Sequence, residues 1–177
     1  MLDVCTIRPM TNNDLSLVLS WRNHPNVRHF MFTQHEIKIE EHRNWFTAAN
    51  QDSTKRLLIV ETEDDPIGFV QFSDVICGGV AVWGFYTRPD APKGSGLNLG
   101  ATSLNYAFNI LKLHKVCGQA IESNQASISF HKRLGFSQEG MLRDQRLIDG
   151  KYHSLICFGI LNGEWKIKYN KLNGNNN

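Results

Sequence analysis

The sequence predicts an α/β (α+β) fold with a mixed, mostly antiparallel central sheet and flanking helices. Three observations support this prediction. Strand-like runs at 55–61, 67–76 and 80–87 follow one another with short turns between them, as in an antiparallel meander. The last of these runs leads through a glycine-rich turn into a helical pattern. A hairpin follows near the C-terminus, because Asp149-Gly150 favours a two-residue turn.

The segments before the meander predict one strand and two helices. Residues Val4 to Arg8 are typical of a short strand that ends at a proline. Polar residues 11–14 can cap a helix that continues with apolar residues at helical spacing, and His24-Pro25 ends it. The stretch 21–34 is aromatic and basic without a clear period, and a second helix is predicted over 39–50.

The second half of the chain predicts alternating strands and helices. A central helix follows the glycine turn and presents apolar residues from Leu97 to Leu111, and a strand is expected over 115–122. The next helix, 124–134, ends at Gly135, which suits a helix C-terminus. Two hairpin strands are predicted over 136–149 and 151–161. We expect the polar tail, 170–177, to be disordered. Residues 1–169 are therefore expected to form a single domain.

Composition excludes several function classes. The 177 residues are the size of one domain, and a net charge of +2 is too small to indicate a nucleic-acid partner. The sequence has neither an apolar run long enough for a membrane span nor a signal-peptide pattern, so we expect a cytoplasmic protein. The four scattered cysteines form no CxxC pair and have no nearby histidine at zinc-ligand spacing, which predicts buried free thiols and no metal: Cys5, Cys77, Cys117 and Cys157.

The turn Lys93-Gly94-Ser95-Gly96 lies between a strand and a helix. A helix N-terminus presents unpaired N–H groups and the positive end of the helix dipole, which suits a phosphate or pyrophosphate. By itself the turn is weak evidence, because two glycines also serve in any tight turn. Neither a P-loop motif nor a complete dinucleotide fingerprint is present.

This turn and the stretch 121–136 together resemble the Gcn5-related N-acetyltransferase (GNAT) superfamily. Its members pair a glycine-containing phosphate loop with a downstream helix that carries an asparagine, a tyrosine and a Gly-Phe pair. Here the helix carries Asn124, Gly135 and Phe136, and His131 stands where many members have the tyrosine. Lys93 and Asn98 also depart from the loop pattern. The order of elements matches over nearly the whole chain.

The resemblance implies the GNAT fold, with a splayed strand pair, and acetyl transfer from acetyl-CoA without a metal. The splay would hold the pantetheine arm, and the turn would hold the pyrophosphate. The cofactor-binding residues implied are Phe85, Tyr86, Thr87, Lys93, Gly94, Ser95, Gly96 and Asn124. An amine acceptor must lose a proton and the leaving thiolate must gain one. Glu122 is the candidate base, and its alternative is an exposed carboxylate at a strand end. His131 and Tyr86 are the candidate acids. The alternative for His131 is a surface residue, and the alternative for Tyr86 is a core residue.

Within the superfamily, the stretches WRNHPNVR, HEI and EEHRNWF resemble the branch that acts on nucleotide-linked amino sugars in pseudaminic acid biosynthesis and flagellin glycosylation. The resemblance implies acetylation of the 4-amino group of UDP-4-amino-4,6-dideoxy-N-acetyl-β-L-altrosamine. Guanidinium groups bind phosphates in a fork, and aromatic side chains can stack on uracil. The candidate acceptor-binding residues are Arg22, Arg28, His29, Phe30, Met31 and Trp45; Trp45 also suits a core position.

Two other functions fit the same sequence. Ribosomal-protein alanine acetyltransferases share part of the signature, so the acceptor can be a protein N-terminus. A degenerate acyl-CoA-binding module is the second alternative, for which His131 in place of tyrosine is the single supporting feature. We expect a small-molecule acceptor and neither a nucleic-acid nor a membrane partner, and the edge strands and C-terminal hairpin permit a homodimer.

Overall fold

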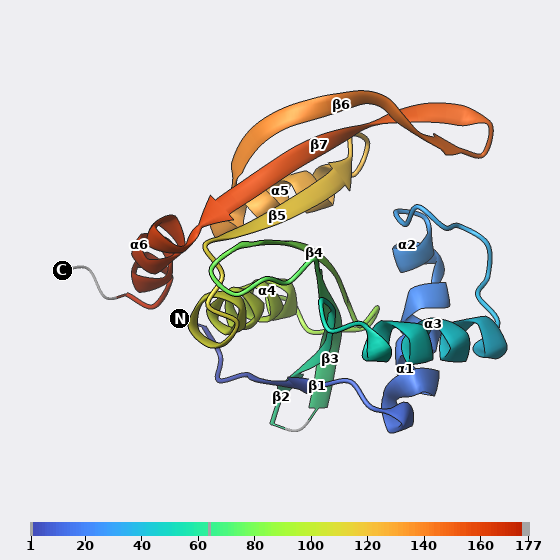
Figure 1. Cartoon of the computed structure of the whole chain (residues 1–177), viewed down its shortest axis with the longest axis horizontal. Coiled ribbons are helices and arrows are strands. Elements are labelled where there is room, and N and C mark those ends of the chain that lie inside the picture. The colour runs from blue at the N-terminus through green and yellow to red at the C-terminus, as the bar shows by residue number, and fades with distance from the viewer. Residues whose placement is uncertain (1, 64, 175–177) are drawn as a thin grey trace.

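The computed structural model describes residues 2–63 and 65–174. Over these residues seven strands form one sheet in the order β1-β2-β3-β4-β5-β7-β6, and β4 with β5 is its single parallel pair (Figure 1). The strands are β1 (Thr6–Pro9), β2 (Arg56–Thr62), β3 (Asp65–Ser73), β4 (Val80–Thr87), β5 (Lys115–Ile121), β6 (Ser137–Ile148) and β7 (Lys151–Leu161). The helices are η1 (Asn12–Asp14), α1 (Leu15–Asn23), α2 (Pro25–Arg28), α3 (Ile39–Gln51), α4 (Ser95–Asn105), the π-helical turn η2 (Tyr106–Ile110), α5 (Gln125–Leu134) and α6 (Asn162–Leu172). The predicted mixed, mostly antiparallel sheet is confirmed.

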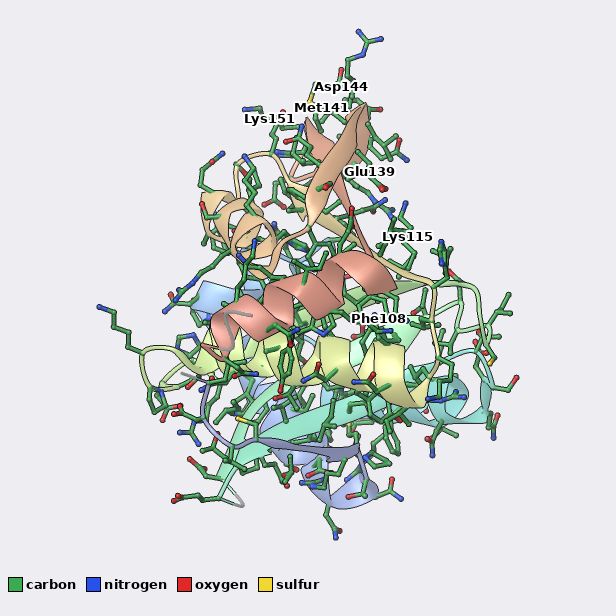
Figure 2. The ribbon with its side chains drawn as sticks, turned by 90° about the vertical axis from the view of Figure 1, so that its left-hand side faces the viewer. Phe108, Lys115, Glu139, Met141, Asp144 and Lys151 are labelled. Carbon is green, nitrogen blue, oxygen red and sulfur yellow. The ribbon has the colours of Figure 1, made fainter. Side chains whose placement is uncertain are left out.

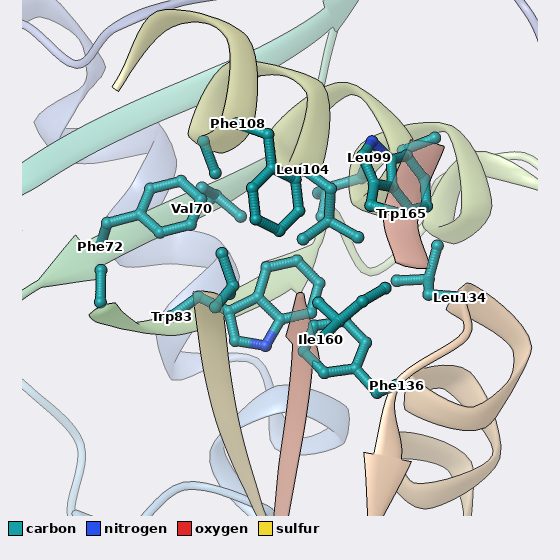
Figure 3. Close-up of a cluster of buried hydrophobic side chains, with 14 of the residues drawn as sticks. Val70, Phe72, Trp83, Leu99, Leu104, Phe108, Leu134, Phe136, Ile160 and Trp165 are labelled. Carbon is teal, nitrogen blue, oxygen red and sulfur yellow. The ribbon is translucent and has the colours of Figure 1, made fainter. Parts of the chain in front are cut away.

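Helices cover both faces of the β1–β4 half of the sheet. Side chains alternate between the faces of a strand, and β2 is buried on both. Its residues Leu57 and Ile59 pack with α1 and α3, whereas Leu58 and Val60 belong to the larger core beneath α4. In Figure 3, Trp83 of β4 lies at the centre of this core, stacked on Phe136 at 5.1 Å between ring centroids.

Several predicted boundaries are confirmed. Strand β4 has the predicted ends, and Asp149 and Gly150 adopt positive φ angles of 48° and 77° in the turn between β6 and β7. Helix α5 is capped as expected, because the Asn124 side chain accepts a 3.0 Å hydrogen bond from the Ser127 N–H. Gly135 ends α5 in the left-handed conformation, with φ at 94°.

Other details differ from the sequence prediction. Part of the irregular stretch 21–34 forms α2, where Pro25 takes the first helical position. Asp65 and Pro66, predicted in a turn together with residue 64, pair with Thr62 and Glu61 in the β2–β3 ladder; residue 64 lies outside the described residues. Strand β3 ends at Ser73 rather than at Ile76.

Helix α6 was not predicted, and it includes residues 170–172 of the expected tail. Its sequence is polar apart from a few side chains, and Trp165 is its single buried residue. The Trp165 indole N–H donates to the Asn105 side chain at 2.9 Å, which docks α6 on the end of α4. The predicted tail therefore begins after α6, and residues 175–177 lie outside the described residues.

The β6–β7 hairpin extends beyond the body of the molecule (Figure 2), and β6 is exposed along almost its whole length. Lys115 of β5 and Glu139 of β6 form a 2.7 Å ion pair across β7. The four cysteines are free, but Cys77 is exposed and the other three are half-buried, so the prediction of buried thiols is wrong for Cys77. In the described part of the chain, none of the helices has the length and apolar character required for a membrane span.

Candidate active site

The parallel strands β4 and β5 pair only where Val80–Val82 face Lys115–Cys117, and beyond this point they diverge. The splayed strand pair implied by the sequence is therefore confirmed. A cavity of about 540 Å³ lies in the opening and is lined by the diverging ends of both strands and by α5. It can take a long, narrow ligand segment, because backbone groups of both strand ends face a gap rather than a partner strand.

Five of the predicted cofactor-binding residues line this 540 Å³ cavity: Phe85, Tyr86, Thr87, Gly96 and Asn124. The first three are at the end of β4, Gly96 is in the first turn of α4, and Asn124 is the cap of α5. Sequence positions about forty residues apart thus meet at one opening. This arrangement is what a cofactor bound between the two strands requires.

The other three predicted cofactor residues form the glycine turn beside the cavity and do not line it. Gly94 has φ at 104° and is the N-terminal cap of α4, so a side chain there would be strained. The Ser95 N–H already donates to the Pro92 carbonyl at 3.1 Å, so it is engaged within the turn. Lys93 is exposed beside the positive end of the eleven-residue helix α4. The turn fits a pyrophosphate through its charge and through the N–H groups of Gly94 and Gly96.

A second cavity of about 360 Å³ lies between α1, α3 and the middle of the sheet. It shares six lining residues with the first, so the two cavities form one continuous cleft: Met31, Phe32, Gln71, Gly84, Phe85 and Tyr86. We refer to the 360 Å³ part as the acceptor cavity and to the 540 Å³ part as the cofactor cavity. The two parts meet where β4 leaves β5, which is where a bound thioester and an amine would have to meet.

Arg22 is the cation of the acceptor cavity. Its Nη2 donates to the Thr33 carbonyl at 2.7 Å, while its Nη1 is buried without a hydrogen-bond partner among the described residues. Burial lowers the pKa of Arg22, but a guanidinium stays protonated in proteins. The cavity therefore contains a positive charge with an unused donor.

The structure divides the predicted acceptor-binding residues into three groups. Arg22, Met31 and Trp45 line the acceptor cavity, and Phe30 lines the cofactor cavity. Arg28 and His29 line neither cavity. The Arg28 guanidinium instead faces Glu36 at 3.8 Å, and the exposed His29 ring packs edge-on against Phe30.

Tyr86 lines both cavities and packs against Phe69, with ring centroids 5.2 Å apart. Burial raises the pKa of its phenol, and the nearby Arg22 charge opposes this only in part. The phenol therefore keeps its proton at neutral pH. Tyr86 lines both cavities, and a protonated phenol can donate to a leaving thiolate.

His131 is buried, so the alternative of a surface residue is wrong. Its Nδ1 lies 2.8 Å from the Ser127 carbonyl, and its Nε2 accepts from the Trp83 indole N–H at 3.2 Å. An indole nitrogen can only donate and a carbonyl can only accept, so the proton must be on Nδ1. Burial lowers the pKa of His131 to about 4. Both ring nitrogens are thus engaged within the protein, and this geometry disfavours His131 as the acid.

Glu122 follows the end of β5 but lines neither cavity. Its side chain is exposed, and its Oε1 accepts from the Ser154 N–H at 3.4 Å, which ties it to β7. Its backbone N–H donates to the Ser154 carbonyl at 3.0 Å. The structure thus gives Glu122 the position of an exposed strand-end carboxylate, the alternative considered above.

Sequence reasoning missed two features of the cleft. His42 and Gln71 line the acceptor cavity, and the spacing of His42 and Trp45 on one helix face was the available signal. The second feature is a contact between β6 and a residue that lines the cleft: the Arg146 guanidinium lies 4.6 Å from the centroid of the Phe32 ring. The register between β6 and β7 shifts between Leu142 and Arg146, and such a shift is not evident from sequence.

Comparisons with known proteins agree with this arrangement. Residues 5–137 match a family model described as an acetyltransferase (GNAT) domain. The chain is 28% identical over 137 residues to the acetyltransferase PseH of Campylobacter jejuni, covering 77% of this chain and 85% of that protein. It is 26% identical over 162 residues to the spermidine N(1)-acetyltransferase of Escherichia coli K12, covering 90% of this chain and 87% of the relative.

Solved structures share the fold. The spermidine N-acetyltransferase of Vibrio cholerae in complex with CoA and spermine superposes with a TM-score of 0.84 at 24% identity, over 92% of this chain and 98% of that one. At this level of identity the likeness shows the architecture of the molecule, and the acceptor has to be argued from the residues of the cleft.

Proposed function

This chain belongs to the GNAT family and is an acetyl-CoA-dependent N-acetyltransferase, and from that premise we propose that its acceptor is a UDP-linked 4-amino-dideoxy sugar. Acetylation would occur at the 4-amino group. This reaction would place the protein in pseudaminic acid biosynthesis and flagellin glycosylation. The observation that carries the proposal is the half-buried guanidinium of Arg22 in the lining of the acceptor cavity, with its Nη1 buried and unpartnered among the described residues.

A buried cation with an unused donor is costly unless a ligand completes its hydrogen bonds. The Nη1 atom of Arg22 has no such partner in the described structure, although Nη2 is held by Thr33. A nucleoside diphosphate supplies phosphate oxygens that a guanidinium binds strongly. The aromatic wall formed by Phe32, Trp45 and Tyr86 offers flat apolar surface for a base or a deoxy sugar.

The charges of the acceptor cavity oppose a polyamine. The single carboxylate among the residues that line it belongs to Glu41, which is exposed and lies 3.1 Å from the His35 ring. A polycation would therefore meet the Arg22 charge without a buried counter-charge. A peptide N-terminus, the alternative acceptor, carries no diphosphate for Arg22. Spermidine and a ribosomal-protein peptide are accordingly the comparison substrates.

The chemistry assigned to the cleft is direct attack of the amine on the thioester carbon. The new N–C bond forms as the C–S bond breaks, one proton leaves the nitrogen, and one proton reaches the thiolate. We assign the second proton to the Tyr86 hydroxyl, since it lines both cavities and stays protonated at neutral pH. The ends of β4 and β5 would hold the pantetheine arm, and Lys93 with the start of α4 would hold the pyrophosphate.

The test is acetyl-CoA turnover, followed by release of free thiol, with each of three acceptors separately. We expect turnover with the UDP-4-amino sugar and little with spermidine or the peptide. Turnover with the peptide alone would transfer the function to the protein N-terminal alternative and leave the acetyltransferase class unchanged. Binding of acetyl-CoA without turnover of any acceptor would favour the non-catalytic acyl-CoA-binding module.

A substitution of Arg22 tests the carrying observation directly. We expect Arg22→Gln to raise KM for the sugar nucleotide by about 10- to 100-fold, because a charged hydrogen bond is worth about 1.5–3 kcal/mol. KM for acetyl-CoA should stay within about twofold. The matched control is Arg43→Gln, which removes an exposed guanidinium from α3. An unchanged sugar-nucleotide KM in Arg22→Gln would refute the proposed role of Arg22.

A further inference from the structure

A buried histidine in the acceptor cavity has no role in the chemistry described so far. His42 is 4% exposed on α3, lines the acceptor cavity, and has its Nε2 enclosed without a hydrogen-bond partner among the described residues. Buried polar atoms in native proteins almost always have partners, so an unpaired one requires an explanation. The backbone of Leu15 acts on this ring as a hydrogen-bond acceptor, so one ring N–H points toward α1 and the other ring nitrogen keeps a lone pair.

The ring of His42 is held in place by aromatic packing. It stacks on Trp45 with centroids 5.0 Å apart and planes 20° apart, and Trp45 meets Phe69 edge-on at 6.0 Å. Phe69 in turn packs on Tyr86 of β4. A continuous set of aromatic contacts therefore connects His42 to β4, the strand at which the two cavities meet. These contacts fix the plane of the imidazole.

The electrostatic surroundings keep this imidazole neutral. Burial is the main cause that lowers the pKa of His42 and the positive charge of Arg22 adds to it, while the Leu15 carbonyl opposes both. The other ionisable groups lining the cavity are Glu41, on the same helix, and Tyr86 of β4. A neutral imidazole carries a proton on one nitrogen, which the Leu15 carbonyl can accept as a hydrogen bond, and a lone pair on the other nitrogen, which can take up a proton.

We propose that His42 is the general base of the acetyl transfer, a role that rests on the acceptor cavity being where the amine binds. As the amine nitrogen forms its bond to the thioester carbon, the unprotonated ring nitrogen of His42 takes one proton from that amine nitrogen. After the product leaves, the imidazolium gives its proton to solvent and the Tyr86 phenolate takes one proton from solvent, so both groups return to their starting states and no net proton is released. Directly or through one water, a base must reach the proton it removes, and the 360 Å³ cavity contains both His42 and residues 84–86 of β4.

The other ionisable groups suit this task less well. The Arg22 guanidinium and the Tyr86 phenol hold their protons at neutral pH. The Glu41 carboxylate is exposed and engaged with His35 at 3.1 Å. Glu122, the base expected from the sequence, lines neither cavity. His42 therefore replaces Glu122 in the proposed mechanism.

The experiment compares steady-state kinetics of the wild type with His42→Gln, Glu122→Gln, Glu41→Gln and the control His114→Gln, which removes an exposed histidine. The acceptor is whichever amine the wild type acetylates. We expect His42→Gln to lower kcat by about 100-fold or more, the usual contribution of a general base, with KM for both substrates within about threefold. Glu122→Gln and His114→Gln should keep kcat within about threefold, and Glu41→Gln tests, as a competing base, the one carboxylate among the described residues that line the acceptor cavity. Added imidazole should restore part of kcat in His42→Ala.

Three results would overturn the proposal: a kcat of His42→Gln within about threefold of wild type, a raised acceptor KM with unchanged kcat, or a large loss of kcat in Glu122→Gln or Glu41→Gln instead. Acetyl-CoA affinity and the unfolding midpoint show whether the His42 variants are folded. If they are not, NMR of the wild-type imidazole decides the question. A neutral imidazole whose unprotonated nitrogen shifts its signal when the acceptor binds supports the base, and an imidazolium at neutral pH overturns it.

Acetylation of the peptide but not of the sugar nucleotide would refute the proposed acceptor and leave His42 testable with the peptide. The reverse pattern, sugar-nucleotide turnover that is insensitive to His42→Gln, would retain the acceptor and refute the base. The two proposals therefore fail separately.

Discussion

Substitution of Gly118 in β5 tests the packing of the buried Trp83–His131 pair, which lies where β4 and β5 diverge. A Cβ atom at this position would lie 2.5 Å from Nε2 of His131 and 2.6 Å from Nε1 of Trp83, the two atoms of the buried hydrogen bond. Such distances are shorter than any normal contact, so Gly118→Ala must push the imidazole and the indole apart. Both rings are enclosed by the main core and cannot move away freely.

The expected cost combines three contributions. Overpacking a dense core costs about 1–3 kcal/mol, and a broken hydrogen bond between buried groups costs about 1–3 kcal/mol. The reduced entropy of the unfolded chain returns about 0.4–1 kcal/mol. We expect a net loss of about 3 kcal/mol, equivalent to a decrease of roughly 6–12 °C in Tm for a chain of this size.

Urea unfolding of wild type, Gly118→Ala and Gly140→Ala measures this difference. Gly140 is the matched control, because it is also a strand glycine and a Cβ there would meet nothing within 4 Å. Its substitution should raise the unfolding free energy by about 0.4–1 kcal/mol, because only the entropy of the unfolded chain changes. If Gly118→Ala were as stable as Gly140→Ala, the Trp83–His131 pair would not be packed against Gly118 as described.

Two further predictions concern stability. Burial lowers the pKa of His131 from 6.5 to about 4 in the folded protein. The stability that the neutral imidazole contributes to the folded state is therefore complete above pH 6.5 and is lost as the pH falls toward 4. A shift of one pKa unit corresponds to about 1.4 kcal/mol, so between pH 6.5 and 4 the unfolding free energy of wild type should fall by about 3 kcal/mol more than that of His131→Phe. Urea unfolding at several pH values measures this difference, and equal losses in the two proteins would contradict the buried neutral imidazole. Asn124→Ala removes the α5 cap and should cost about 1 kcal/mol by the same assay, whereas Asn124→Ser should recover most of it.

Local sequence signals identified most of the elements of this protein. The β-branched and aromatic run 80–87, the Asp149-Gly150 turn, the Asn124 cap and the terminal Gly135 each determine backbone conformation through the residue itself or its neighbours. The glycine turn before α4 is local in the same sense. These features, taken with the family resemblance, were sufficient to predict the fold class and the strand opening between β4 and β5.

Tertiary structure decided what the individual side chains of the cleft can do. His131 is exposed or buried according to whether Trp83 and Phe158 cover it, and no local pattern encodes these contacts. The helical spacing of residues in α3 places His42 beside Trp45. The charge near the imidazole comes from Arg22 of α1, which only the packing of α1 against α3 brings close. Helix α6 was missed because a single buried tryptophan, bonded to Asn105, holds it against the core. The sequence by itself determined the backbone framework, because turns, caps and strand propensity act between near neighbours. The burial and protonation of the site residues were decided only by folding, because they depend on groups that are distant along the chain.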